Sequence, residues 1–315
     1  MEAVASLARH VLTQMSRVIV GQERLKTDCL IVLLCEGHAL VEGAPGLGKT
    51  LAIKTLSRLL RLDHHRVQCT SDLMPSDIVG TNILNMSTGG FQFHKGPVFT
   101  HLLLVDEVNR MPPRTQAALL ECMEERQVTV DGVRHDLSRF FSVFATQNPI
   151  EFEGTYPLPE AQLDRFLVKI RVPYPEPAEE AQLLSNAQAG FDARHLDSID
   201  LAVMDPEMLT EARREVRAVS VQESLFTYIA QLVRRTREWP AVSLGASPRA
   251  ALNLMLFSKA IAAIDGRSYL VPDDVKQAMA PVLRHRLVVR PEADLDGITP
   301  DQILQDVLRA VDVPQ

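Results

Sequence analysis

Residues 43–50 have the composition of a loop that binds phosphate. Gly43, Gly48, Lys49 and Thr50 stand at the spacing G-x-x-x-x-G-K-T of a P-loop. In such a loop the glycines let backbone N–H groups approach phosphate oxygens, the lysine reaches the β- and γ-phosphates, and the threonine hydroxyl binds Mg²⁺. The predicted nucleotide-binding residues are Gly43, Ala44, Pro45, Gly46, Leu47, Gly48, Lys49, Thr50 and Leu51.

A simpler interpretation of this segment is a glycine-rich turn that happens to contain a lysine. The surrounding pattern favours the P-loop. An apolar run precedes the loop, and residues 51–56 continue as a helix with an apolar face. A helix that starts near Lys49 also directs the positive end of its dipole at the loop, which favours a bound anion. The sequence therefore predicts a nucleotide site here.

Two acids, Asp106 and Glu107, directly follow the apolar residues 102–105. An aspartate at the carboxyl end of a strand beside the P-loop strand can hold Mg²⁺ through water. A second acid directly after it can act as a general base on the attacking water. Acids at a strand end are often merely solvated, but the fully apolar strand favours the catalytic interpretation. We expect Thr50 and Asp106 at the metal ion and Glu107 as the base.

Three further polar residues are less specific in their sequence context. Asn148 follows the next buried strand, where an amide can hydrogen-bond both the γ-phosphate and the lytic water. An asparagine before Pro149 is equally typical of a turn. Arg165, on a short helix, and Arg249, one turn into a later helix, are each typical of a surface ion pair.

The residues Val20 and Gly21 lie ahead of the first strand. In P-loop ATPases of several kinds this part of the chain packs on the adenine base. An ordinary turn between two helices explains the same residues equally well.

The order of the predicted elements indicates two parts. Strands alternate with helices up to residue 172, which predicts an α/β fold with a doubly wound sheet. Two glycine-bearing hairpins interrupt it, near residues 89–90 and 131–132. Prolines then mark a linker, and we place domain boundaries at 1–174 and 178–315. The second part is expected to be helical at 178–188, 206–219, 221–238, 248–264, 272–287 and 300–311.

Composition and charge argue against several other classes of protein. The net charge of −7 over 315 residues disfavours a protein built mainly to hold nucleic acid. The longest unbroken apolar run, residues 29–35, is far too short to span a membrane, and the first residues lack the layout of a signal peptide. The four cysteines show no C-x-x-C spacing. Buried free thiols suit a reducing compartment, so we expect the cytoplasm.

Together these features resemble an AAA+ ATPase and, more narrowly, the MoxR family. The resemblance rests on LVDEVNR at 104–110, QAALLE at 116–121, ATQNP at 145–149, EGTYPLPEAQLDRF at 153–166 and GASPR at 245–249. It implies a P-loop AAA+ core with a central parallel five-stranded sheet, followed by an all-α helical lid domain. The hairpin near residues 89–90 matches the helix-2 insert of this clade.

The resemblance also implies roles for single residues. Residues 43–50 are Walker A, Asp106 and Glu107 are Walker B, and Asn148 is the sensor-1 residue. Arg165 is the arginine finger that reaches the ATP of a neighbouring subunit, and Arg249 is the sensor-2 arginine that the lid brings onto the γ-phosphate. A homo-oligomeric ring, in similar ATPases a hexamer, follows from a finger supplied by the neighbour. The implied cofactors are ATP and Mg²⁺.

The resemblance implies a chaperone-like ATPase that remodels, activates or matures a separate partner protein, often one with a von Willebrand factor A domain. Two alternatives are a metal-chelatase motor subunit and a nucleic-acid-dependent AAA+ motor. For the latter, the predicted helices carry a possible basic surface, although interleaved acids favour a salt-bridged face. Its arginines are Arg213, Arg214, Arg217, Arg234, Arg235, Arg237, Arg284 and Arg286.

Overall fold

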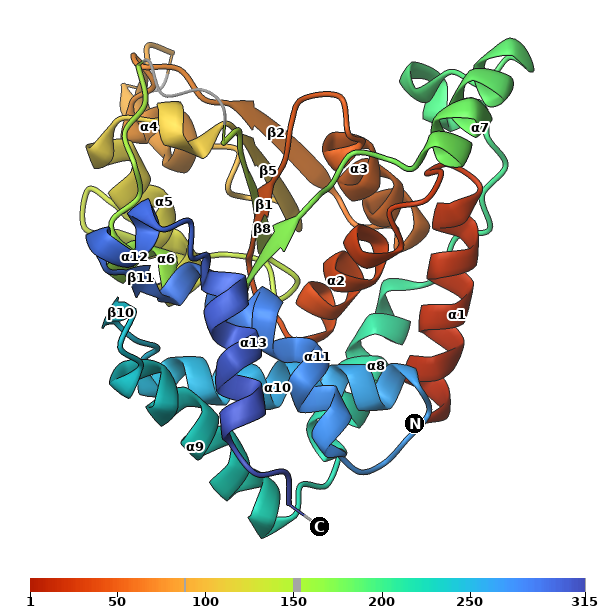
Figure 1. The fold of residues 1–315 in the computed structure, drawn as a ribbon. Coiled ribbons are helices and arrows are strands. Elements are labelled where there is room, and N and C mark those ends of the chain that lie inside the picture. Colours follow the sequence, from red (N-terminus) through yellow and green to blue (C-terminus); the bar gives the residue numbers. More distant parts are fainter. Residues whose placement is uncertain (88, 150–153, 315) are drawn as a thin grey trace.

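A parallel sheet of five strands forms the centre of the first half of the chain (Figure 1). The computed structural model describes residues 1–87, 89–149 and 154–314, so Glu153 of the fourth motif lies outside the described residues. In spatial order the strands are β2 (His64–Gln68), β5 (Leu102–Asp106), β8 (Ser142–Gln147), β1 (Ala39–Glu42) and β9 (Val168–Arg171). The predicted five-stranded parallel sheet is confirmed.

The sheet separates two hydrophobic cores, because successive side chains of a strand point to opposite faces. Leu102 and Leu104 of β5 belong to the core shared with α1 (Glu2–Ser16), α2 (Glu23–Leu34) and α3 (Lys49–Leu59). Leu103 and Val105 belong to the core on the other face, which is covered by α4 (Pro75–Val79) and α5 (Pro113–Glu125). Because both faces are covered, β5 is buried along its whole length, and its first four residues are apolar.

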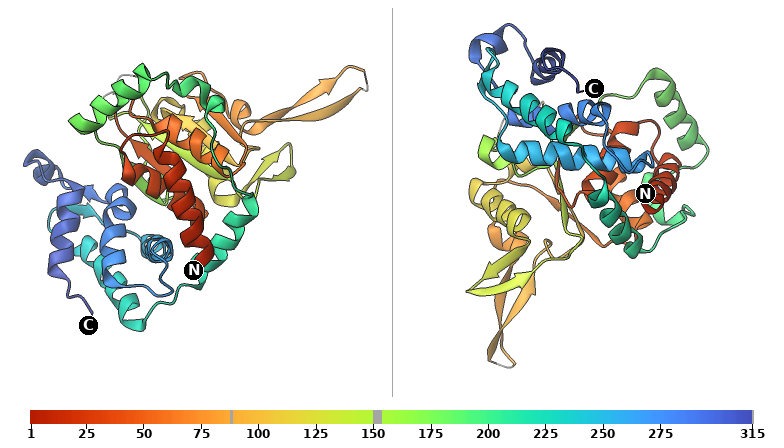
Figure 2. Two further views of the ribbon diagram at one scale, coloured as in Figure 1. Left: turned by 90° about the vertical axis from the view of Figure 1, so that its right-hand side faces the viewer. Right: turned by 90° about the horizontal axis from the view of Figure 1, so that it is seen from below.

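Two antiparallel hairpins project from the sheet domain (Figure 2). The first joins β3 (Gly80–Asn85) to β4 (Gly90–Lys95), and the second joins β6 (Gln127–Val130) to β7 (Val133–Asp136). Their bases are in contact, since the rings of Phe93 and His135 stack with centroids 4.2 Å apart. Both hairpins lie where the sequence predicts them.

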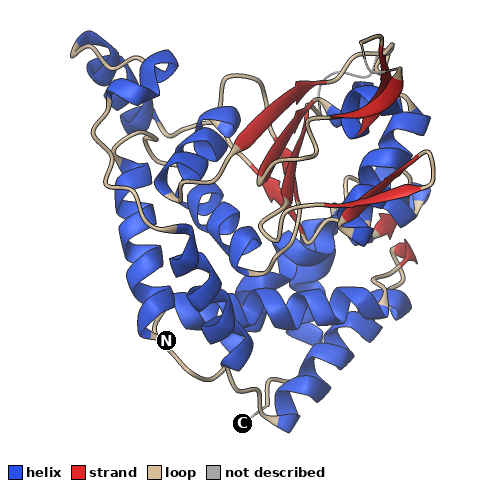
Figure 3. Ribbon diagram, turned by 180° about the vertical axis from the view of Figure 1, so that it is seen from behind, coloured by secondary structure: helices blue, strands red, loops and turns tan. Residues whose placement is uncertain are grey.

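The rest of the chain is almost entirely helical, and Figure 3 shows the strands gathered on one side of the molecule. Short turns of helix occur at η1 (Val108–Arg110), α6 (Glu160–Leu163), η2 (Ala193–Ser198) and η3 (Arg284–Arg286). β10 (Val242–Leu244) and β11 (Val288–Val289), which the sequence did not predict, form a small antiparallel pair. The remaining helices are α7 (Pro177–Gln188), α8 (Pro206–Ala218), α9 (Glu223–Glu238), α10 (Pro248–Ile264), α11 (Pro272–Leu283), α12 (Pro291–Leu295) and α13 (Pro300–Ala310).

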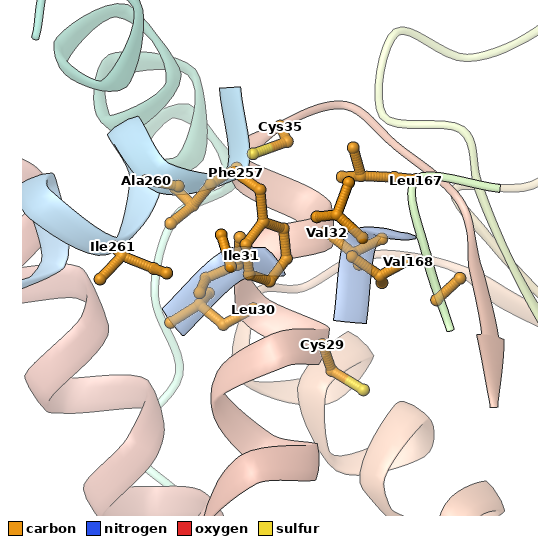
Figure 4. Packing of buried hydrophobic residues seen from close by; sticks show 14 of the residues in the cluster. Cys29, Leu30, Ile31, Val32, Cys35, Leu167, Val168, Phe257, Ala260 and Ile261 are labelled. Carbon is orange, nitrogen blue, oxygen red and sulfur yellow. The ribbon is translucent and has the colours of Figure 1, made fainter. Parts of the chain in front are cut away.

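The helical part packs directly onto the N-terminal helices. Figure 4 shows Phe257 and Ile261 of α10 packed beside Leu30 and Ile31 of α2 in one continuous core. By contrast, α7 has no buried residue, and the segment after it runs back along α3, where the N–H of Met204 donates to the carbonyl of Leu59 (2.7 Å). The domain boundaries 1–174 and 178–315 stay a prediction, because the core continues from one part into the other.

Within the part of the chain that the structure describes, none of the helices combines the length and the apolar character needed to cross a bilayer.

Candidate active site

The loop between β1 and α3 has the backbone shape of a phosphate cradle. Gly46 and Gly48 have φ angles of +83° and +80°, a conformation that suits glycine. A side chain built at either position would meet no atom within 4 Å, so the space beside the loop is open. Gly48 is the N-cap of α3 and has no side chain to satisfy the first N–H groups of the helix. These N–H groups are therefore suited to a bound anion.

Lys49 folds over this loop. Its Nζ donates to the carbonyl oxygens of Gly43 and Ala44, the latter at 3.1 Å. Burial lowers the pKa of the ammonium group, and the carboxylates of Asp106 and Glu107 act in the opposite direction. Phosphate oxygens can replace the two carbonyl acceptors, since both kinds of oxygen accept from the same donors.

Asp106 ends β5 and is held by two side chains from the neighbouring strands. Arg66 Nε of β2 donates to its Oδ2 at 2.6 Å, and Thr146 Oγ1 of β8 donates to its Oδ1 at 3.1 Å. Strand order explains this contact, because β5 lies between β2 and β8 in the sheet. The expectation that Asp106 ends a strand directly beside the P-loop strand is wrong, since β8 lies between β5 and β1. Arg66 and Thr146 were not predicted as site residues; the sequence signal was only their position near the ends of predicted strands.

Glu107 turns out of the strand with φ +58°. Its backbone N–H donates to Thr146 Oγ1 at 3.0 Å, so one hydroxyl contacts both acids. Its carboxylate Oε2 accepts from Gln68 Nε2 at 3.1 Å and lies 3.5 Å from Arg110 Nε. Gln68 of β2 and Arg110 of η1 therefore anchor the side chain, which lines the cavity described next.

A cavity of about 430 Å³ joins these elements. Its lining contains Lys49 and Thr50 of the loop, the two acids, and the buried Asn148. Residues 45–50 of the predicted Walker A, both Walker B acids and the sensor-1 residue thus come together at the carboxyl ends of β1, β5 and β8, while Gly43 and Ala44 line a neighbouring cavity. This is the edge of an open α/β sheet where ligands bind.

The oxygen donors of this cavity fit a magnesium ion that arrives with a nucleotide. Thr50 supplies a hydroxyl and Asp106 a carboxylate, and Mg²⁺ prefers a few protein oxygens together with phosphates and water. Among the described residues there is no group of three or more His, Cys, Asp or Glu side chains arranged to hold a metal. A metal at this site would depend on phosphate oxygens for the rest of its ligands.

The two arginines predicted to act on the γ-phosphate lie elsewhere. Arg165 Nη2 is 3.0 Å from Glu124 Oε2, and Arg249 Nη1 donates to Glu124 Oε1 at 3.1 Å. Among the described residues, those that line the P-loop cavity include neither arginine. The family resemblance predicts that the lid brings Arg249 onto the γ-phosphate. In this structure Arg249 lies instead on Glu124, outside the lining of the cavity in its own chain. The N-terminus of α10 packs beside α6 and the end of α5, so Arg249 joins Arg165 there.

Val20 and Gly21 also lie outside the lining of this cavity. Gly21 has φ +60°, and a side chain there would come within 2.1 Å of Glu179 Oε1 on α7. Gln22 Nε2 donates to the carbonyl of Pro173 at 2.9 Å. This segment therefore contacts the start of the helical part. Beside it, a second cavity of about 610 Å³ is lined by Gly43, Leu47, Pro173 and Tyr174, among others.

The fold and the site define a P-loop ATPase of the AAA class with a helical lid. Residues 38–168 match the family described as "ATPase family associated with various cellular activities (AAA)", and residues 234–307 match "AAA lid domain". A solved structure of a putative ATPase from Cytophaga hutchinsonii superposes with a TM-score of 0.90 and 40% identity, over 100% of this chain and 98% of that one.

Similar sequences narrow the class. Chaperone MoxR1 of Mycobacterium tuberculosis is 41% identical over 96% of this chain and 81% of its own length. Protein MoxR of Methylorubrum extorquens is 30% identical over 95% of this chain and 91% of its own. A Bacillus subtilis protein, YeaC, is 42% identical over 95% and 92%. The chain therefore belongs to the MoxR family of AAA+ ATPases, and it is an ATPase.

Proposed function

We propose that this ATPase hydrolyses Mg-ATP in a homo-oligomeric ring, a hexamer, in which Arg165 and Arg249 of one subunit complete the site of the next. The observation that carries the proposal is the placement of both arginines on Glu124, outside the cavity of their own chain. Because Arg165 and Arg249 lie side by side on one carboxylate, both guanidinium groups can bind the same anion. The terminal phosphate of a neighbour's ATP is such an anion.

The same proposal assigns a role to each residue of one site. The P-loop N–H groups and Lys49 hold the phosphates, and Glu107 orients and deprotonates the attacking water while Asn148 holds it from the side. Thr50 and Asp106 would hold Mg²⁺, which would supply positive charge beside the phosphates. An arginine supplied by another chain contributes about 10³–10⁵ in rate to comparable reactions. Val20 and Gly21 remain the predicted contacts of the adenine base.

A mixing experiment tests the shared site. Lys49→Ala and Arg165→Ala proteins should each be nearly inactive, because one loses the phosphate-binding lysine and the other the arginine. Mixed and reassembled, they should recover ATP hydrolysis at interfaces that combine an intact P-loop with an intact arginine. The matched control mixes Lys49→Ala with Glu107→Gln, which are both defects of the P-loop side and should not complement. Failure of the first mixture in assembled rings would contradict the proposal.

We further propose that the ring acts as a chaperone in the cytoplasm and remodels or matures a protein with a von Willebrand factor A domain. The name of the relative Chaperone MoxR1 supports the chaperone role, and four buried free cysteines agree with a reducing compartment.

The contacts of three arginines argue against the basic surface that a nucleic-acid motor needs. Arg213 and Arg286 are only 5% and 6% exposed, and Arg237 Nε donates to the carbonyl of Ala246.

The Glu107→Gln variant provides the test for the partner. It should bind ATP and release its client slowly, since hydrolysis is the step that loses its base. Affinity purification with ATP should therefore enrich one client above the level seen with Lys49→Ala, which cannot hold the nucleotide. Equal recovery of every protein with the two variants would argue against an ATP-dependent client.

A further inference from the structure

Arg286 is almost completely buried where the lid meets the sheet domain; its side chain is only 2% exposed. From the sequence it is one of the arginines of a possible basic helix surface. Instead its guanidinium lies against residues 164–167, which surround Arg165. Nε donates to Asp164 Oδ1 at 2.6 Å, Nη2 to the carbonyls of Phe166 (2.6 Å) and Asp164 (3.1 Å), and Nη1 to the carbonyl of Leu167 (3.2 Å).

These bonds hold the backbone on both sides of Arg165, while the side chain of Arg165 is paired with Glu124. Nη1 of Arg286 also donates to the carbonyl of Val282, in the last turn of α11. The guanidinium therefore bridges the last turn of α11 and the arginine-bearing segment. The neighbouring His285 adds a bond from its ring to the carbonyl of Phe166 (3.1 Å).

Asp164 connects the same segment to the second arginine. Its Oδ1 accepts from Arg286, and its Oδ2 accepts from Ser247 Oγ at 3.0 Å. Ser247 is the N-cap of α10, and Arg249 lies in the first turn of that helix. One carboxylate thus ties Arg165 to the two lid elements, η3 and α10, while Glu124 pairs the two arginine side chains directly.

This arrangement needs arginine in particular. Five N–H groups in a flat fork can serve several carbonyls and a carboxylate at once, whereas the lysine ammonium offers three donors at one point. Replacing Arg286 by lysine keeps the charge opposite Asp164 but loses most of the hold on the carbonyls of residues 164, 166 and 167.

We propose that Arg286 is a positioning residue for the arginine pair: with Asp164 it holds the backbone of Arg165 against η3 and against the start of α10, the helix that carries Arg249. The arginine pair of one subunit is thereby coupled to the packing of its own lid against the sheet domain, and through that pair the lid is coupled to the nucleotide of the neighbouring subunit. This inference rests on the proposed function, in which the two arginines act on the adjacent subunit.

The test uses the full-length Arg286→Lys protein. We expect turnover to fall by about 10²-fold, as for a catalytic group displaced by about 1 Å, while the affinity for a fluorescent ATP analogue stays within about twofold. The matched control is Arg267→Lys. Arg267 binds Asp274 through two hydrogen bonds (2.6 and 2.7 Å) within the lid, away from the arginine pair. It should lose stability and keep its turnover.

Mixed rings separate positioning from general damage. Arg286→Lys subunits have an intact P-loop and Glu107, and Glu107→Gln subunits have a correctly held arginine pair. Random assembly of equal amounts places the two in the productive order at about a quarter of the sites of a head-to-tail ring. Activity well above that of either variant alone is expected, because the defect of Arg286→Lys lies in what it offers its neighbour.

The outcomes distinguish the two proposals. If the Lys49→Ala and Arg165→Ala mixture recovers but the Arg286→Lys and Glu107→Gln mixture does not, the positioning role is wrong and the shared site stands. Recovery of neither mixture overturns both. Full activity of Arg286→Lys alone also overturns the positioning role. Should Arg286→Lys fold poorly, Asp164→Asn replaces it in the same mixture, with the same expected recovery and the same contradicting result.

Discussion

Among single residues, Thr146 has the most consequential contacts in the active site. Its hydroxyl donates to Asp106 and accepts from the backbone of Glu107, so it sets the relative position of the two acids. Glu107 has a left-handed backbone conformation, which costs about 1–2 kcal/mol for a residue other than glycine. Such a conformation persists where neighbouring contacts enforce it. Thr146 supplies one of those contacts and is itself buried.

The substitution Thr146→Val tests this role, because valine keeps the shape and removes the hydroxyl. We expect the free energy of unfolding to fall by about 1–3 kcal/mol, the cost of leaving buried partners unsatisfied, and ATP turnover to fall as well. Denaturant titration and steady-state ATPase assays measure the two effects. Thr115→Val is the control, since buried Thr115 donates one bond to the carbonyl of Leu73 away from the site. The Thr115→Val protein should lose stability but keep its ATP turnover. If turnover fell equally in both variants, a role for Thr146 in the site would be contradicted.

At the scale of elements, the imidazole of His38 connects three of them near the amino ends of strands β1 and β8. It precedes β1, lies at hydrogen-bond distance from the carbonyl of Met123 in α5 (3.0 Å), and accepts from the N–H of Val143 in β8 (2.9 Å). A neutral ring makes both bonds, and complete burial lowers the pKa of His38 from 6.5 to about 3. The joint therefore depends on an unprotonated imidazole.

This pKa gives a stability that depends on pH. Between pH 6.5 and about 3 the unfolded chain binds a proton at His38 that the folded chain does not. The contribution is complete above pH 6.5 and is lost as the pH falls, with a slope of about 1.4 kcal/mol per pH unit for one proton. Free energies of unfolding measured from pH 4 to pH 7 should show a shallower slope for His38→Gln than for the unmodified chain.

Asp28 provides the opposite control. Burial raises its pKa from 3.8 to about 6, against the attraction of Arg24, so the folded state takes up a proton there between these values. That contribution decreases as the pH rises. Asp28→Asn should therefore make the slope with pH steeper, and a shallower slope in this variant would contradict the assignment.

For the whole molecule, the core that joins the sheet domain to the lid has a consequence for assembly. Side chains of α1 and α2 share one core with α8 and α10, and Glu215 of α8 accepts from the N–H groups of Ala3 and Val4 at the start of α1. A carboxylate at a helix N-terminus is favourable to the helix dipole. In this arrangement the cavity and the arginine pair occupy different parts of one subunit, which suits head-to-tail contact between copies.

Dilution tests this consequence. If each site needs two subunits, ATP turnover per subunit should fall as the protein is diluted below the range in which the ring assembles. Sedimentation at the same concentrations should show assembly falling in parallel. Arg165→Ala should remain nearly inactive at every concentration. Constant turnover in a solution shown to contain single subunits would contradict the shared site.

Much of this protein could be predicted from residue types and spacing. The P-loop, the two acids at the end of β5 and the caps of the lid helices are local: a glycine-rich turn, an apolar strand and an N-cap serine each depend on neighbours in the chain. Ser247, for example, correctly marks the start of α10. The parallel sheet follows as well, because strands alternating with helices permit few other arrangements.

The contacts between distant segments came only from the tertiary structure. Strand order places Arg66 and Thr146 on either side of Asp106, and no spacing along the chain encodes that order. An arginine on an amphipathic helix reads as a surface residue, yet the docking of η3 on β9 buries Arg286 beside the segment of Arg165. Capping, turn geometry and hydrophobic periodicity each depend on a few neighbouring residues, so they can be predicted from the sequence directly. Which surfaces meet depends on the packing of the entire chain, and that packing placed both arginines at Glu124.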